Sequence, residues 1–142
     1  MKIAIGGDHA GYQYKEALKP FIEELGHEVK DFGPYSDESA DYPDFVHPLS
    51  TAVEKKECDF GILICGSGNG VAITANKHQG IRAVLCWLDE LASLARQHNN
   101  ANVLCMAARF TELDLVKQMT KTFLSTDFEG GRHERRVSKI SC

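Results

Sequence analysis

Five short apolar runs alternate along the chain with stretches in which apolar residues recur every three or four positions. The clearest of these stretches are 88–95 and 113–124, where Leu, Ala, Val and Phe mark one face of a helix. Strands that alternate with helices form a parallel sheet, so this order predicts an α/β fold. The expected strands are KIAIG (2–6), HEVKDF (27–32), GILIC (61–65), RAVLC (82–86) and NVLCM (102–106).

The expected sheet has one polar edge strand. Four of the runs are nearly continuous in apolar residues, as in strands that helices cover on both faces, whereas 27–32 is more polar. Right-handed crossovers between five strands produce a doubly wound, three-layer sandwich of the Rossmann-like type, and we expect the strand order 2-1-3-4-5. In that order the strands 2–6 and 61–65 are neighbours. Their connections leave in opposite directions, so a crevice is expected at their carboxyl ends.

Two more helices are expected at 12–25 and 42–56, although each contains a proline. Pro20 and Pro48 lie inside these stretches, where a proline costs about 3 kcal/mol unless it falls in the first turn or at a kink. We therefore expect irregular starts to both helices. Three other residues fit helix boundaries: Pro43 as a first helical position, and Gly26 and Gly80 as C-terminal ends.

The length and charge of the chain limit its class. At 142 residues it suits a single domain, 1–142, with an arginine-bearing tail from about residue 128. A net charge of -4 and a pI near 5.8 argue against a broad nucleic-acid surface. No apolar stretch approaches the roughly 18 residues that a membrane span needs. We therefore expect neither nucleic acid nor a membrane as a partner.

Cysteine usage indicates a reducing compartment. The five cysteines are odd in number and include no C-x-x-C pair, which argues against a disulfide framework and against a zinc site. The N-terminus runs straight into an expected strand, with no sign of an export signal. We therefore expect a cytoplasmic protein without a bound metal.

The segment FGILICGSGNG (60–70) places a thiol at the end of an apolar strand, directly before a glycine-rich turn. Backbone N–H groups of such a turn can converge on one point, and a following helix adds partial positive charge, so the turn suits an anion. The same field would stabilise a thiolate at Cys65, which is the reactive form of the side chain. Ser67 offers one more donor. The alternatives are a buried structural cysteine and a turn that is merely tight.

Familiar loop motifs fail at identifiable positions. A nucleophile elbow needs a glycine two residues on either side of Ser67, and neither position is glycine. Tyr12 stands where a P-loop has lysine, and Asp8 would repel the pyrophosphate of a dinucleotide. A cysteine-phosphatase loop needs an arginine where this chain has Val71.

Other candidate residues lie at the ends of expected elements. Asp8 and His9 follow the first strand and face the crevice, although a helix cap and a neutral hydrogen bond would also explain them. His98 and Asn99 end a helix, where polar residues are ordinary.

The tail EGGRHERR (129–136) groups three arginines after two glycines. A solvated basic end is the simplest explanation. If the tail is helical, Arg132 and Arg136 share a face at i, i+4 and can bind one phosphate, whereas Arg135 points to one side.

Together these features resemble ribose-5-phosphate isomerase type B, within the sugar-phosphate isomerase family that also contains the galactose-6-phosphate isomerase subunits. The resemblance covers almost the whole chain, and its motifs are specific in combination. The segments that carry it are GGDHAGY (6–12), SADYPDF (39–45), ILICGSGNGVAITANK (62–77), GIRAVLC (80–86), ARQHNNANVL (95–104) and EGGRHERR (129–136).

The resemblance implies that ribose 5-phosphate and ribulose 5-phosphate are interconverted through a cis-enediol(ate), without a cofactor or a metal. It implies that Cys65 is the base, that His98 helps to open the sugar ring, and that Ser67 and the glycine turn hold the enediolate oxygens. It also implies a set of substrate-binding residues: Asp8, His9, Tyr42, Gly66, Gly68, Asn69, Gly70, Asn99, Arg109, Arg132 and Arg136.

The expected position of His98 conflicts with a one-chain site. His98 ends the helix that follows the fourth strand, so it lies at the end of the sheet opposite to the crevice that holds Cys65. If His98 serves this site, a neighbouring copy must supply it. We therefore expect a homodimer with active sites shared between subunits, with a tetramer as the larger alternative.

Two other functions remain open from the sequence. The substrate can instead be a hexose 6-phosphate, such as allose or galactose 6-phosphate, with the same proton chemistry. The chain can also be a non-catalytic phosphate-binding module, because glycine turns on doubly wound sheets often only bind.

Overall fold

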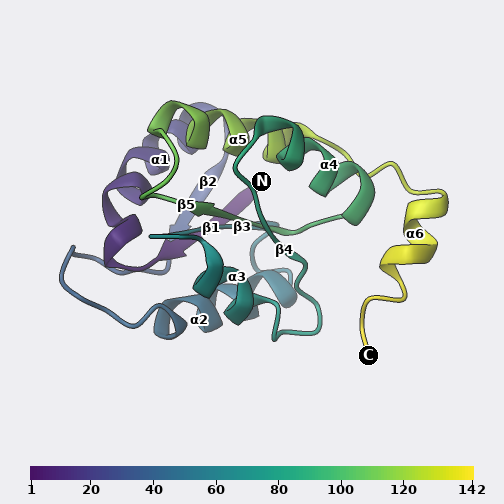
Figure 1. Ribbon diagram of the computed structural model, residues 1–142, viewed down its shortest axis with the longest axis horizontal. Coiled ribbons are helices and arrows are strands. Elements are labelled where there is room, and N and C mark those ends of the chain that lie inside the picture. Colours follow the sequence, from purple (N-terminus) through teal and green to yellow (C-terminus); the bar gives the residue numbers. More distant parts are fainter.

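A five-stranded parallel sheet forms the centre of the protein, and helices cover both of its faces (Figure 1). This computed structural model describes all residues from 1 to 142. The predicted three-layer α/β sandwich is confirmed. The strands are β1 (Lys2–Gly7), β2 (Glu28–Asp31), β3 (Phe60–Cys65), β4 (Ala83–Leu85) and β5 (Val103–Ala107).

The strand order is β2-β1-β3-β5-β4, so the predicted order 2-1-3-4-5 is wrong in its last two places. β5 lies between β3 and β4, with Leu104 in register with Ile62 on one side and Val84 on the other. All five residues of β5 are buried, whereas the three residues of β4 are partly exposed. The longer strand takes the interior position, where both of its faces and both of its edges are covered.

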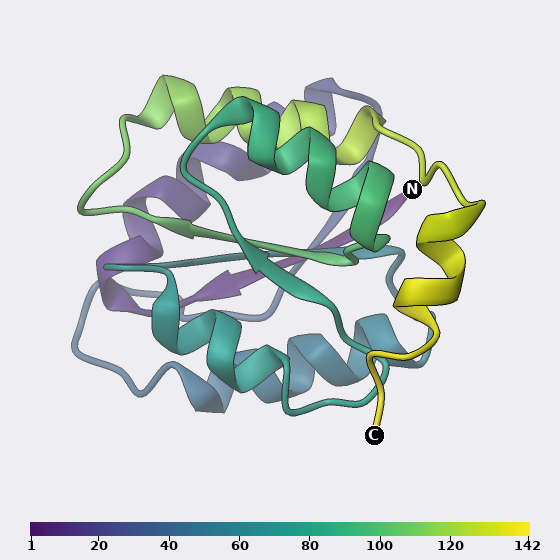
Figure 2. The same cartoon turned by 45° about the vertical axis from the view of Figure 1, so that its right-hand side comes forward.

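The inserted β5 also decides which helices share a face. The chain turns back between β4 and β5, and this places α4 (Asp89–Asn99) on the face opposite to α3 (Asn69–Ala75). In Figure 2, one layer holds α1 (Tyr12–Glu24), α4 and α5 (Leu113–Ser125), and the other holds α2 (Pro43–Glu54) and α3. The short α6 (Arg132–Val137) lies beside the end of α4, away from the sheet (Figure 2).

Strand alternation divides the core into two layers. Ile62 and Ile64 of β3 pack with the α1, α4 and α5 side, and Leu63 and Cys65 pack with the α2 and α3 side. The period of two along a strand therefore directs the Cys65 side chain toward the layer that contains α3.

Most of the predicted helix boundaries are confirmed. Pro43 opens α2, while Pro20 and Pro48 lie within helices that continue past them. Gly26 follows the last turn of α1 with a positive φ of 96°. Gly80 is not a helix end, because α3 already ends at Ala75. There the side-chain amide of Asn76 binds both the N–H and the C=O of Ala83, which pulls the chain out of the helix toward β4.

A buried ion-pair network joins α1 to the edge strand β2. Lys15 is only 1% exposed, and its Nζ lies 2.7 Å from Oδ2 of Asp31. Lys19 Nζ lies 2.9 Å from the same oxygen, and Glu16 contacts both lysines. Burial by itself would raise the pKa of Asp31, but hydrogen bonds from Lys15, from the N–H of Gly33 and from Lys19 outweigh it and lower the pKa.

Replacing Lys15 with Met should lower the free energy of unfolding by about 3 kcal/mol, because Asp31 loses its buried partner. Urea unfolding followed by circular dichroism measures this change. Lys19→Met is the control and should cost about 1 kcal/mol or less, since Lys19 is partly exposed. The stabilisation from Asp31 exists above its ordinary pKa, so the Lys15 effect should shrink as the pH falls below about 4. Equal losses in the two variants would contradict this account.

Candidate active site

A tight turn at the end of β3 presents Cys65. The turn consists of Gly66, Ser67 and Gly68, and α3 begins directly after it. Gly68 has a φ of 76°, a conformation that favours glycine. A Cβ at this position would also collide with the side chain of Leu85 and lie 3.2 Å from the carbonyl carbon of Met106. The turn therefore needs glycine at position 68 both for its backbone angle and for space.

The sulfur of Cys65 is within reach of a backbone donor. The N–H of Gly68 donates to Sγ at 3.2 Å. Cys65 is 5% exposed, and this small exposure opens into a pocket. A backbone N–H aimed at a sulfur is the kind of contact that stabilises negative charge there.

The other buried cysteines have a different environment. Burial raises the pKa of Cys58, raises that of Cys86 to about 11, and raises that of Cys105 well above its ordinary value. All five cysteines are free, and Cys142 is the exposed one. Cys58, Cys86 and Cys105 are therefore held as neutral thiols in the core.

The pocket at Cys65 has a volume of about 390 Å³. It collects residues from the ends of β1 and β3, the start of α2 and the loop after β5, as expected for the crevice between diverging connections. Its lining residues are Asp8, Tyr42, Cys65, Gly66, Ser67, Gly70, Arg109 and Phe110.

Two glycines let large side chains approach the thiol. A Cβ at Gly70 would lie 2.6 Å from the ring of Tyr42, and one at Gly66 would lie 3.2 Å from a guanidinium nitrogen of Arg109. The phenol and the guanidinium therefore lie directly over the glycine turn. Arg109 brings a positive charge to this pocket, which suits an anionic ligand.

Asp8 and His9 make structural contacts and also line the cleft. Asp8 Oδ1 accepts from the N–H groups of Ala10 (2.9 Å) and Gly11 (3.2 Å), so it caps the short helix that follows β1. His9 Nδ1 accepts from the N–H of Ala40 at 3.1 Å, which leaves Nε2 as the ring nitrogen that can face a ligand. Both residues line a neighbouring hollow of about 570 Å³ that shares Asp8 and Tyr42 with the Cys65 pocket.

A separate pocket of about 360 Å³ contains His98, and none of its residues lines the Cys65 pocket. Its residues come from the end of α4, from α6 and from the segment after α6, and α6 lies beside the end of α4 (Figure 2). The expected separation of His98 from Cys65 within one chain is therefore confirmed. The lining residues are His98, Asn99, His133, Arg136, Val137 and Ile140.

Glu129 and the two histidines of this pocket form a close cluster. Glu129 Oε1 lies 3.7 Å from His98 Nε2 and 3.5 Å from His133 Nε2. The three ligand atoms lie within 4.8 Å of one another, which is close enough to consider a metal ion. The two rings, however, are stacked 4.2 Å apart with only 9° between their planes. Lone pairs in parallel planes do not converge on one ion, so the cluster as arranged suits a shared carboxylate better than a metal.

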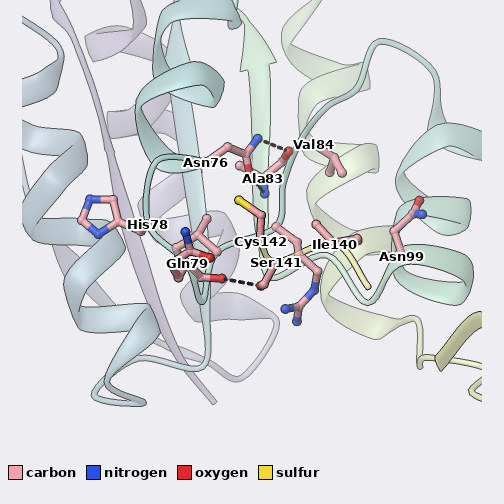
Figure 3. A pocket seen from close by; sticks show the side chains of 11 residues that line it. Asn76, His78, Gln79, Ala83, Val84, Asn99, Ile140, Ser141 and Cys142 are labelled. Atoms are coloured by element: carbon pink, nitrogen blue, oxygen red, sulfur yellow. Dashed lines mark hydrogen bonds between the residues drawn. The ribbon is translucent and has the colours of Figure 1, made fainter. Parts of the chain in front are cut away.

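A third cavity, of about 380 Å³, adjoins the His98 pocket (Figure 3). The last residues of the chain, Ile140 to Cys142, form one of its walls, and Ser141 Oγ donates to the carbonyl of Gln79 at 3.4 Å. Asn99 and Ile140 line both cavities. The C-terminal tail is therefore part of the surroundings of His98.

Comparison with known proteins gives the chain a family. The profile of the Ribose/Galactose Isomerase family matches residues 3–140. The chain belongs to this family. Ribose-5-phosphate isomerase B of Escherichia coli (strain K12) is 45% identical over 99% of this chain and 95% of its own length.

Solved structures of family members have the same fold. Ribose-5-phosphate isomerase B of Clostridium thermocellum superposes with a TM-score of 0.97 at 48% identity, covering 99% of this chain and 95% of that one. The Mycoplasma genitalium enzyme, solved with bound ribulose-5-phosphate, superposes with a TM-score of 0.94 at 43% identity, covering 98% of this chain and 93% of that one. None of the helices of the present chain combines the length and the apolar character that crossing a bilayer requires.

The residues predicted for the site of this ribose/galactose isomerase family member fall into two groups. Asp8, Tyr42, Cys65, Gly66, Ser67, Gly70 and Arg109 lie together, with His9 beside them and Gly68 and Asn69 in the same turn. His98, Asn99 and Arg136 line the other pocket, and Arg132 lies on the same helix as Arg136.

Phe110 of the Cys65 pocket, His133 of the His98 pocket, and Glu129 beside His133 were not among the predicted site residues. Phe110 lines the Cys65 pocket although it is 81% exposed, and its only sequence signal is the adjacent Arg109. Glu129 and His133 stand within the same tail motif as the arginines, where only the arginines were considered as ligands. The sequence feature that could have indicated His133 is its position between two glycines and a run of basic residues.

Limited alkylation with iodoacetamide should modify Cys65 and Cys142 but leave Cys58, Cys86 and Cys105 unmodified. The first two reach a pocket or solvent, whereas burial keeps the other three protonated. Peptide mass spectrometry at neutral pH measures the order of modification. Alkylation of Cys86 or Cys105 ahead of Cys65 would show that the thiol environments are assigned wrongly.

Proposed function

We propose that the protein interconverts ribose 5-phosphate and ribulose 5-phosphate through a cis-enediol(ate), with Cys65 as the base. The observation that carries the proposal is the Cys65 thiol at the mouth of a pocket beside a glycine turn, with Tyr42 and Arg109 packed over the turn. The relatives named above support the choice of substrate, since one of them was solved with ribulose-5-phosphate bound.

The reaction moves one proton between two carbons. The Cys65 thiolate removes the proton from C2 of the open-chain aldose, the C–H electrons form the C1=C2 double bond, and the carbonyl electrons move to O1. The proton of the C2 hydroxyl moves to O1, the thiol returns its proton to C1 as the C1=C2 electrons form the new C1–H bond, and C2 becomes the ketone carbonyl. A positioned base contributes about 10²- to 10⁴-fold to such a step.

The glycine turn stabilises the charge that develops on oxygen. Ser67 Oγ accepts from the N–H of Asn69 at 3.3 Å, so its own hydroxyl hydrogen remains free to donate to the enediolate. Gly66, Gly68 and Gly70 keep the backbone of the turn close to the substrate. One well-placed donor of this kind contributes about 2.7–4 kcal/mol to transition-state binding.

Binding of the rest of the sugar phosphate is divided between polar and basic groups. Asp8, His9, Tyr42 and Asn99 contact the hydroxyls and the ring oxygen. The phosphate pairs with arginines: Arg109 from the loop after β5, and Arg132 and Arg136, which are exposed on one face of α6. This phosphate binding positions the reacting carbons without taking part in the chemistry.

The complete site requires two copies of the chain. His98, in its protonated imidazolium form, donates a proton to the ring oxygen as the C1–O bond of the cyclic sugar breaks, and the C1 hydroxyl proton leaves to water. His98 and the α6 arginines belong to the second pocket, so a neighbouring copy supplies them to Cys65. Phe110 and Trp87, which are 81% and 58% exposed near the Cys65 turn, offer an apolar surface for that copy.

A cytoplasmic location fits cysteines that form no disulfide.

Incubation of the purified protein with ribose 5-phosphate in D2O should give ribulose 5-phosphate and incorporate solvent deuterium. Cys65→Ala should keep sugar-phosphate binding but lose at least about 100-fold in kcat, because the base is gone. Cys142→Ala is the matched control and should retain full activity, since this thiol is exposed and does not line the Cys65 pocket. A wild-type protein that binds ribose 5-phosphate without turnover would be a binding module. A strong preference for allose 6-phosphate or galactose 6-phosphate would mean that the substrate is a hexose 6-phosphate and not ribose 5-phosphate.

Mixing two inactive variants should restore activity if the sites are shared. A dimer of one Cys65→Ala chain and one His98→Asn chain has one complete site and one site that lacks both groups. Random re-pairing makes about half of the dimers mixed, so about one quarter of the wild-type activity should return. The readout is ketose formation after co-refolding an equimolar mixture, with each variant refolded alone as the control. No recovery, or an active monomer, would contradict shared sites.

A further inference from the structure

Glu129 lies between the two imidazoles of the His98 pocket. A single oxygen, Oε1, is 3.7 Å from His98 Nε2 and 3.5 Å from His133 Nε2. Nothing in the reaction described above uses Glu129 or His133. Two stacked histidines that face one carboxylate oxygen need an explanation, because each of the three side chains is otherwise free to adopt several rotamers.

The backbone fixes the position of Glu129 relative to His98. The N–H of Glu129 donates to the carbonyl of Gln97 at 3.1 Å, so residue 129 is attached to the last turn of α4, next to His98. Gly130 and Gly131 then take positive φ values of 70° and 58°, which reverse the chain into α6. The carboxylate is therefore delivered by a defined turn.

His98 has no other support within the chain. It makes no side-chain hydrogen bond, and its side chain is 40% exposed. The contacts that define its ring are the stack on His133, at 4.2 Å and 9°, and the charge of Glu129. Because 3.7 Å is longer than a hydrogen bond, the carboxylate attracts the N–H edge of the ring and the stack fixes the plane.

The charges around the cluster leave the carboxylate available to His98. Burial, followed by the nearby His98, Arg132 and Arg136, lowers the pKa of His133 against the opposing effect of Glu129. This shift favours the neutral form of His133. Glu129 is the one carboxylate among the groups that shift the pKa of His133, and Arg132 and Arg136 extend from the same short helix as that ring.

We propose that Glu129 is a positioning residue for His98: its carboxylate holds the proton on Nε2 and sets the direction of the ring, so that the proton given to the substrate leaves from Nδ1, while His133 supports the ring face as a stacking partner. The inference rests on the proposed role of His98 in ring opening. Glu129 forms and breaks no bond in the reaction. In the proposed dimer the second copy covers this pocket, and the reduced contact with water strengthens an ion pair that is weak on the surface of one chain.

Glu129→Gln should lower kcat for ribose 5-phosphate about 10-fold and leave KM within about twofold of wild type, since an acid that is present but poorly oriented loses part of its contribution. Glu134→Gln is the matched control, because it removes the same charge from an exposed position of α6. Its kcat should not change. Equal kcat values for the two variants would overturn the proposal.

Proton exchange on the ketose separates positioning from a general loss of structure. Ribulose 5-phosphate is acyclic, so exchange of its C1 hydrogen with D2O needs Cys65 but no ring opening. Glu129→Gln should exchange this hydrogen at the wild-type rate while it is slow on the cyclic aldose. A parallel fall in both rates would show that Glu129 only maintains the fold, and the proposal would fail. An inactive wild-type protein would instead remove the proposed function.

Nitrogen NMR tests the same contact without any turnover. In the neutral form, which remains after the ring has given up its proton, His98 of the wild-type protein should show a protonated Nε2 and an unprotonated Nδ1, with the resonance assigned by its loss in His98→Asn. In Glu129→Gln the ring should become a mixture of the two tautomers. An unchanged spectrum would overturn the proposal whatever the kinetics show.

Two substitutions at His133 test the stacking partner. His133→Phe keeps a flat ring against His98 and should retain most of the wild-type kcat, whereas His133→Ala removes the support and should lose about as much as Glu129→Gln. Equal losses in the two variants would mean that a ring nitrogen of His133 is required, and the assignment of His133 as a stacking support would be wrong.

Discussion

The close contact between β1 and β3 at their carboxyl ends is the constraint on which the site depends. A Cβ at Gly7 or Gly11 would collide with the backbone of Ile64, and the N–H of Asp8 donates to the carbonyl of Ile64 at 3.3 Å. The loop after β1 is therefore pressed against the residue that precedes Cys65. Glycine at both positions is what allows a carboxylate and a thiol from distant parts of the sequence to meet.

The two ends of the sheet carry different parts of the chemistry. The carboxyl ends hold the thiol and the glycine turn, whose positions depend on rigid strands and are fixed by backbone contacts. The other end holds His98 and the α6 arginines, which depend on a short helix and on side-chain contacts. In the proposed reaction the groups that act on the C–H bonds are thus the most constrained, whereas two of the three arginines proposed to bind the phosphate are attached to a peripheral element.

The sequence predicted the α/β fold because strand and helix periodicities are local properties, and it predicted the crevice because the order of the first three strands follows from them. The places of β4 and β5 could not be predicted, since RAVLC and NVLCM are similarly apolar and only their lengths and burial in the sheet distinguish them. Gly80 was misread because the side chain of Asn76, and not a glycine, ends α3.

The candidate site, like the fold, could be predicted from the sequence only in part. Cys65 and its turn are visible in the sequence because a strand, a thiol and three glycines are consecutive. Glu129 and His133 could not be assigned to His98, because the contact depends on how α6 folds back onto α4 across some thirty residues of chain. Phe110 was missed for another reason: an exposed aromatic residue has no pattern until the pocket beside it is known.

The place of β5 inside the sheet has a consequence for how the protein is made. A ribosome releases β3 and β4 before β5 exists, and neither of the earlier strands pairs with the other in the finished molecule. Until residue 107 has emerged, the nascent polypeptide carries an unpaired hydrophobic border along β3, the kind of surface that invites aggregation and chaperone capture. Most of the chain must therefore be synthesised before the sheet can close, and the glycine turn after β3 forms beside the last strand to be made.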